Sequence, residues 1–132
     1  SAFCHLNIIE IEEERLPENP SAALINAGLG MEGKRILSKL PTGSRIYALC
    51  IEGKMLTSEE LAADISHAVL NGKSNLSFII GGSFGLSKEV KQASHSSLSF
   101  SKMTFPHQLI RILLTEQLYR AFMIQSGGKY HK

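Results

Sequence analysis

Two turns in the second half of the chain carry residue types that suit a small ligand. The first, residues 81–85 (GGSFG), directly follows the apolar run 76–80. Glycine there lets a ligand approach the backbone and tolerates positive φ. The second, residues 100–105 (FSKMTF), offers backbone amides and carbonyls beside two aromatic rings and a methionine, which suits a flat heterocycle such as adenine. Each turn follows an expected strand and opens a helix, and an open α/β sheet binds its ligand at such positions. Taken singly, each could also be a purely structural turn.

The last residues of the chain form a second candidate site. Tyr130, His131 and Lys132 place an aromatic ring, an imidazole and a cation next to one another. Such groups can stack on a nucleic-acid base and accept or donate a proton near neutral pH. Polar chain ends also fray commonly, so a disordered tail is the alternative interpretation.

The sequence lacks the motifs of several common active sites and binding sites. No G-K-[ST] follows the glycine turn, and neither turn holds paired carboxylates or an activated serine. Cys4 and Cys50 are isolated, which predicts reduced thiols and no metal site. A nominal G-x-G-x-x-G lies inside an expected helix rather than after a strand, so we reject a dinucleotide fingerprint there.

Charge is distributed unevenly along a chain whose net charge is only +2. Residues 81–132 carry seven lysines and arginines against two glutamates, and residues 1–80 have a small acidic excess. A basic segment joined to glycine turns favours a polyanionic partner such as RNA. A solvated basic face is the alternative.

The pattern of apolar residues, caps and turns predicts alternating strands and helices. We expect strands at 6–14, 45–51, 76–80 and 98–101, and helices at 21–40, 57–70, 87–93 and 106–125. Residues 52–54 (EGK) should turn the chain. This alternation predicts an α/β fold with a mainly parallel sheet flanked by helices. The last helix is apolar on nearly all sides, so we expect it to be buried all round, with a second subunit supplying part of the cover.

Length and composition fit one soluble domain. The chain has 132 residues, of which 43% are hydrophobic and 20% charged. No apolar run approaches the ~18–20 residues of a membrane span. The first residues lack a secretory pattern, and together with the isolated cysteines this predicts a cytoplasmic protein.

Four segments identify a family resemblance. They are LCIEGKMLTSEELA at 49–62, FIIGGSFGL at 78–86, LSFSKMTFPHQLIRILLTEQLYRAF at 98–122, and the terminal YHK. With these motifs the chain resembles the ribosomal RNA large subunit methyltransferase H family of the SPOUT superfamily. The resemblance implies a C-terminal trefoil knot, a homodimer, S-adenosylmethionine as methyl donor, and methylation of N3 of a pseudouridine in 23S rRNA of the large subunit or assembled ribosome. Family members begin with a strand and helix not found here, so residues 1–132 are expected to form a single domain without them. We expect the natural chain to carry that first strand.

The resemblance also assigns residues to roles. It places the methyl donor on Leu49, Gly81, Phe100, Ser101, Lys102, Met103, Thr104 and Phe105. For the transfer itself we expect His131 to accept the proton of the target nitrogen, Tyr130 to stack on the base, and Arg120 or Lys129 to offset developing negative charge. Two other interpretations stay open: a non-catalytic RNA-binding or ribosome-associated dimer, and a methyltransferase acting on another RNA.

Overall fold

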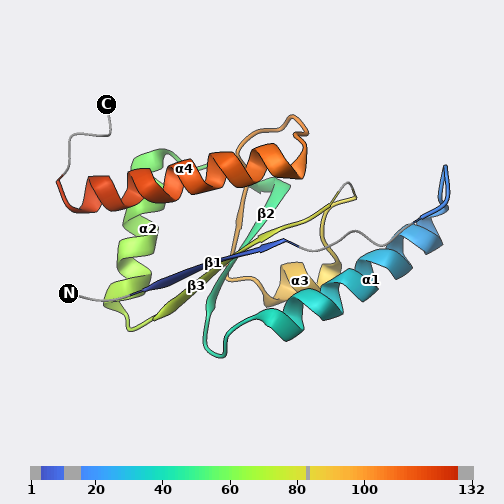
Figure 1. The fold of residues 1–132 in the computed structure, drawn as a ribbon, viewed down its shortest axis with the longest axis horizontal. Helices are drawn as coiled ribbons and strands as arrows, with labels where there is room; N and C mark the ends of the chain where they lie inside the picture. Colours follow the sequence, from blue (N-terminus) through green and yellow to red (C-terminus); the bar gives the residue numbers. More distant parts are fainter. Residues whose placement is uncertain (1–3, 11–15, 83, 128–132) are drawn as a thin grey trace.

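A computed structural model describes residues 4–10, 16–82 and 84–127 of the chain. Within these ranges strands and helices alternate (Figure 1). The elements are β1 (His5–Glu10), α1 (Ala22–Lys39), β2 (Arg45–Lys54), α2 (Ser58–Leu70), β3 (Asn75–Ile80), α3 (Lys88–Ala93), β4 (Ser96–Leu98) and α4 (His107–Gln125). The alternation confirms the predicted α/β class.

The described strands form one parallel sheet in the order β1-β3-β2-β4. The central strand β3 is almost wholly buried, as expected of a parallel strand covered on both faces. Helices α2 and α4 cover one face of the sheet, and α1 and α3 cover the other (Figure 1). Because all strands run the same way, their carboxyl ends meet at one edge, together with the loops that follow them.

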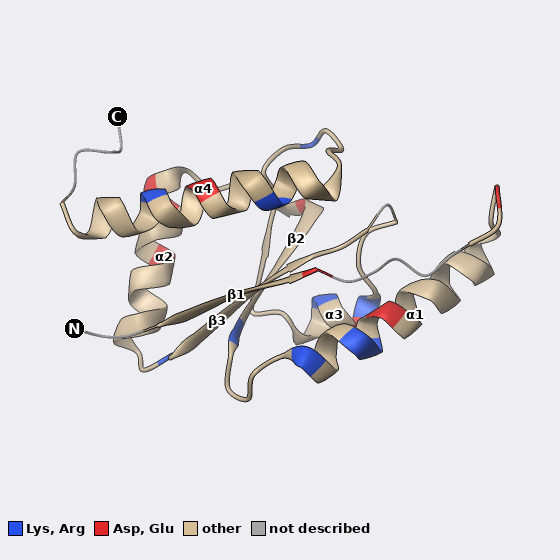
Figure 2. Ribbon diagram, viewed as in Figure 1, with Lys and Arg blue, Asp and Glu red and all other residues tan. Residues whose placement is uncertain are grey.

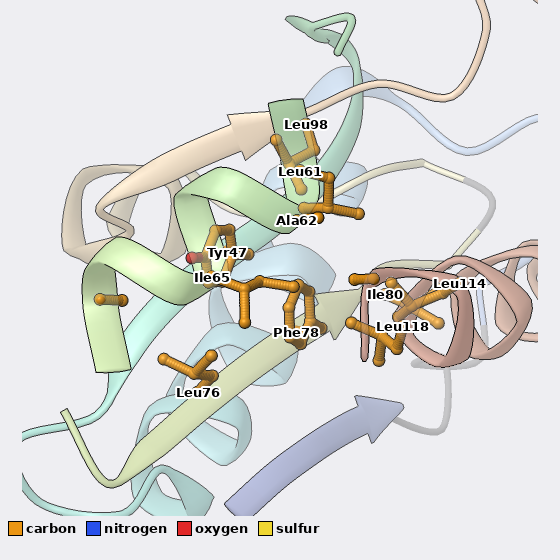
Figure 3. Close-up of a cluster of buried hydrophobic side chains, with 12 residues drawn as sticks. Tyr47, Leu61, Ala62, Ile65, Leu76, Phe78, Ile80, Leu98, Leu114 and Leu118 are labelled. Atoms are coloured by element: carbon orange, nitrogen blue, oxygen red, sulfur yellow. The ribbon is translucent and has the colours of Figure 1, made fainter. Parts of the chain in front are cut away.

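Alternate side chains of the central strands enter two separate cores. On the α2/α4 side, Phe78 stacks on Tyr47 with ring centroids 4.5 Å apart, among leucines and isoleucines of α2 and α4 (Figure 3). On the α1/α3 side, Ile79 and Ala48 pack with Ile36 of α1. The two-residue period of a strand explains why neighbours in sequence enter opposite cores.

Side-chain caps fix the starts of α1 and α2 where the sequence predicted these helices to begin. The Ser21 hydroxyl accepts a hydrogen bond from the Leu24 amide at 3.2 Å. Thr57 and Glu60 form a reciprocal capping box at the start of α2, with distances of 2.8 and 3.0 Å. Each cap satisfies amides that have no partner inside the helix, so the predicted starts of these two helices are confirmed.

The predicted turn at residues 52–54 is wrong. Strand β2 continues to Lys54, which pairs with Leu98 of β4 after an irregularity in register. Gly53 makes this possible because a Cβ there would lie 2.6 Å from the Leu98 carbonyl carbon. The glycine therefore permits close strand approach rather than a turn. The last strand is also displaced, since β4 covers Ser96–Leu98 instead of residues 98–101.

The single chain covers only one side of the last helix, and the cover expected from a second subunit stays a prediction. Helix α4 buries Leu114, Leu118 and Ala121 against the sheet and α2. Four other apolar side chains of the helix are exposed, namely Leu109, Ile112, Tyr119 and Phe122. A helix lying on one face of a sheet can bury only one stripe, so an apolar face of α4 is left uncovered.

Candidate functional site

A cavity of about 730 Å³ opens at the carboxyl ends of β2, β3 and β4. The segments that line it are 49–52 of β2, 80–85 with Ser83 outside the described residues, Lys91 of α3, 98–101, and 103–107 with Ile110 at the start of α4. Its volume lies within the roughly 300–1,000 Å³ typical of small-ligand sites. The parallel sheet therefore places both candidate turns around one space.

Every residue assigned to the methyl donor lines this cavity except Lys102. The residues present are Leu49, Gly81, Phe100, Ser101, Met103, Thr104 and Phe105. They come from three segments that are far apart in the sequence and meet only because their strands are neighbours in the sheet. The structure thus brings the predicted donor residues together, and their roles toward a ligand stay predictions.

The turn after β3 is built from close backbone contacts that only glycine allows. A Cβ on Gly81 would lie 2.6 Å from the Gly85 carbonyl oxygen and 2.9 Å from a methyl carbon of Leu86. Gly85 itself has φ of 85°, and its amide donates to the Gly82 carbonyl at 3.1 Å. These glycines fold the turn tightly and leave backbone groups facing the cavity.

The loop after β4 is held by serine side chains. The Ser99 hydroxyl donates to the Ser101 carbonyl at 2.9 Å, and the Ser101 hydroxyl accepts from the Met103 amide at 3.0 Å. The Ser99 amide donates to the Lys54 carbonyl at 3.0 Å, which ties the loop to the extended end of β2. Such local bonds replace regular secondary structure and define the shape of the loop.

One ion pair and one thiol also line the cavity. Lys91 of α3 donates to the Glu52 carboxylate, and this hydrogen bond is the main reason that the pKa of Glu52 lies below its ordinary value. Burial raises the pKa of the Cys50 thiol, so it is protonated at neutral pH. Sequence reasoning missed these residues because Glu52 was assigned to a turn and Lys91 to a general basic segment.

Of the residues assigned to proton transfer, the structure describes Arg120, and this residue does not line the cavity. Arg120 lies on α4, where its guanidinium bonds the Glu116 carboxylate at 2.7 Å. At about 1.5 Å per residue it is roughly 15 Å along the helix from Ile110. Tyr130 and His131, together with Lys129 and Lys132, lie outside the described residues. These assignments stay predictions.

The part of the chain that the structure describes contains neither a cluster of metal ligands nor a membrane-spanning helix. No three histidine, cysteine, aspartate or glutamate side chains there are grouped as metal ligands. None of the helices described has the length and apolarity to cross a bilayer.

A parallel sheet with a ligand-sized cavity between its carboxyl-end loops is the arrangement in which α/β domains bind small molecules. Sequence comparison names the family. Residues 1–131 match the family described as "Predicted SPOUT methyltransferase", and the chain belongs to this SPOUT methyltransferase family. The resemblance predicted from the sequence is confirmed. The trefoil knot stays a prediction.

Curated relatives match the whole chain. A protein of Clostridioides difficile (strain 630) is 50% identical over all 132 residues, which cover 83% of its own length. Proteins of Leuconostoc mesenteroides subsp. mesenteroides and Bacillus thuringiensis (strain Al Hakam) are 46% and 49% identical over the same span, again 83% of each. All three are named "Ribosomal RNA large subunit methyltransferase H".

Proposed function

We propose that this protein is a single-domain methyltransferase that transfers the methyl group of S-adenosylmethionine to N3 of a pseudouridine in 23S rRNA. The observation that carries the proposal is the meeting of Leu49, Gly81 and most of the loop 100–105 in one cavity. Membership of the SPOUT family and the names of its relatives point to the same reaction class.

The cavity suits an adenosyl group in chemistry as well as in volume. Leu49, Leu98 and Ile110 supply apolar walls, and Phe100 and Phe105 supply aromatic rings. The glycine turn and the serine-held loop present backbone amides and carbonyls, which can bond the polar edge of a purine. These residues would hold the donor by shape and backbone contacts.

The bound donor supplies a methyl group already activated by its sulfonium, so the protein mainly has to position the two reactants. The imide nitrogen of the target base must lose a proton. In this proposal His131 accepts that proton and Tyr130 stacks on the base. Arg120 or Lys129 stabilises the negative charge that develops on the base.

We infer that the working form is a homodimer joined through the exposed apolar face of α4, formed by Leu109, Ile112, Tyr119 and Phe122. Several large apolar side chains exposed along one helix are typical of an interaction site. Pairing around a twofold axis would let Arg120 and the tail of one subunit act at the cavity of the other. In this proposal, both RNA binding and methyl transfer require the dimer.

The proposal is tested by incubating the protein with labelled S-adenosylmethionine and either ribosomes, large subunits or free 23S rRNA. Nucleoside mass spectrometry should find one methylated pseudouridine in at least one substrate. Donor binding without methylated pseudouridine would favour another RNA substrate. Failure to bind the donor would favour the non-catalytic RNA-binding alternative.

A second experiment tests the role of His131. His131→Ala should slow single-turnover methylation by about 10²–10⁴-fold, the usual contribution of a positioned acid or base. His67→Ala is the matched control, because His67 is an exposed histidine on α2. An unchanged rate in His131→Ala would remove the histidine from the mechanism.

A further inference from the structure

The cavity contains one oppositely charged pair. Among its described lining residues, Glu52 and Lys91 are the charged side chains, and His107 is the remaining titratable one apart from Cys50. The pair joins the extended part of β2 to α3, and α3 lies on the face of the sheet opposite α4 (Figure 2). Most of the remaining wall consists of apolar side chains and backbone, so this pair gives the cavity a polar pole.

The pair retains unused hydrogen-bonding capacity. Lys91 Nζ bonds one Glu52 oxygen, and no other described side chain bonds either group. The Glu52 backbone amide also donates to the carboxylate. A carboxylate accepts up to about four hydrogen bonds, so acceptor sites on Glu52 and two ammonium hydrogens of Lys91 are still available to a ligand. The side chains are 61% and 38% exposed for Glu52 and Lys91, so a ligand in the cavity can reach both.

A zwitterionic amino-acid group is the electrostatic complement of this arrangement. Its ammonium can pair with Glu52 while its carboxylate pairs with Lys91, which gives a ring of four alternating charges. Neutral ribose hydroxyls would donate to the Glu52 carboxylate but would offer Lys91 no negative charge beyond that of Glu52. The surface pair on its own contributes little to folding, so its place in the cavity favours a binding role.

We propose that Glu52 and Lys91 bind the amino-acid end of the methyl donor, with Glu52 accepting from the ammonium and Lys91 donating to the carboxylate. This inference rests on the proposed function and adds two binding residues to it. The adenosyl part then lies toward Leu49, Ile110 and the loop 100–105. The donor is thereby oriented from both ends, with its sulfonium between them.

Two ligands that differ only beyond the thioether separate this proposal from its alternatives. S-adenosylhomocysteine carries the amino-acid group, and 5′-methylthioadenosine lacks it but keeps adenosine and sulfur. Calorimetry at low salt should show S-adenosylhomocysteine binding about three- to tenfold more weakly to Glu52→Gln and to Lys91→Met than to wild type. Binding of 5′-methylthioadenosine should be unchanged in both variants.

Matched controls come from the same short helix. Lys88→Met and Glu89→Gln remove the same charges from exposed positions of α3 that do not line the cavity, and both should bind each ligand like wild type. Equal losses for the two ligands in Glu52→Gln or Lys91→Met would overturn the proposal in favour of ribose contact or a structural role. Unchanged affinity for both ligands would overturn it as well.

The same titrations keep the two levels of inference distinct. If wild type binds neither ligand, the proposed donor chemistry itself fails. If wild type binds both with equal affinity, the donor site stands and the assignment of its amino-acid end fails. The difference between the ligands should also shrink as salt rises, because the pair is partly exposed.

Discussion

Gly81 and Gly85 lie in backbone contact across the turn after β3, and a methyl group on Gly81 would fall 2.6 Å from the Gly85 carbonyl oxygen. Gly81→Ala must therefore push the turn open, and it does so at the wall of the cavity. We expect donor binding to fall by at least tenfold, with a loss of about 1–3 kcal/mol in stability typical of overpacking. Calorimetry with S-adenosylhomocysteine and thermal unfolding measure the two effects.

Gly30→Ala provides the control for that experiment. Gly30 lies inside α1 with nothing within 4 Å of its Cβ position. The change should stabilise the protein by about 0.5–1 kcal/mol and leave donor binding unchanged. If Gly81→Ala binds the donor as well as Gly30→Ala does, the turn does not shape the site.

The serine-held loop predicts a smaller and more local effect. In Ser101→Ala the Met103 amide loses its acceptor at 3.0 Å, while the backbone carbonyl that accepts from Ser99 remains. The loop should sample more conformations, and donor affinity should fall about two- to fivefold, the equivalent of one ordinary hydrogen bond. Ser38→Ala, on the exposed end of α1, removes a comparable local bond as a control. Equal affinities in the two variants would contradict the prediction.

A polar network beneath α2 predicts a pH-dependent stability. The hydroxyl of buried Tyr47 donates to Asp64 at 2.5 Å and accepts from Arg45 at 3.1 Å. Burial is the main cause that raises the pKa of Tyr47, and the bond to Asp64 adds to it. The folded state therefore favours the protonated phenol. The resulting stability is fully present below the unfolded pKa of about 10 and is lost as pH rises above it.

Tyr47→Phe removes the hydroxyl and keeps the ring that stacks on Phe78. We expect a loss of about 1–2 kcal/mol at neutral pH, because Asp64 and Arg45 each lose a partner. Above about pH 10 the difference in the free energy of unfolding between wild type and Tyr47→Phe should become smaller. Urea unfolding at pH 7 and pH 10.5 measures both values, and a difference that stays constant would contradict the assignment of the phenol.

The uncovered face of α4 predicts the behaviour of a charged substitution. Ile112 is 64% exposed in the single chain, so Ile112→Glu should leave the fold intact. If this face joins two subunits, the new carboxylate would be buried without a partner. The dissociation constant of the dimer should then rise by a factor of about 10² or more. Leu70→Glu, at an 81% exposed position of α2, is the control. Sedimentation velocity measures the oligomeric state of each variant. If wild type and Ile112→Glu have the same oligomeric state, this face of α4 is excluded as the dimer interface.

The sequence predicted those parts of the fold that depend on local chemistry. The capping box of Thr57 and Glu60 acts within one helical turn, so its position can be predicted from neighbouring residues. Gly53 misled the prediction because its role depends on Leu98, which lies in another strand. The sequence alone does not distinguish a glycine that lets a neighbouring strand approach from a glycine that lies in a turn.

The candidate site was predictable to a similar extent. The loop 100–105 and Gly81 stand out because they interrupt apolar runs, and the resemblance to a family added Leu49. The pairing of Glu52 with Lys91 could not be foreseen, since it joins residues from β2 and α3 through the arrangement of the sheet. The apolar pattern of α4 predicts that a partner covers part of this helix. The pattern alone does not show which face of the helix the partner would cover.

The parallel sheet has a consequence for how the protein folds. Every pair of hydrogen-bonded strands is separated in the chain by at least one helix, and His5 of β1 pairs with Asn75 of β3. No hairpin can nucleate such a sheet, so long loops must close before its contacts stabilise the chain. Refolding should take milliseconds to seconds or longer, and strand edges stay open to other chains until the sheet is complete.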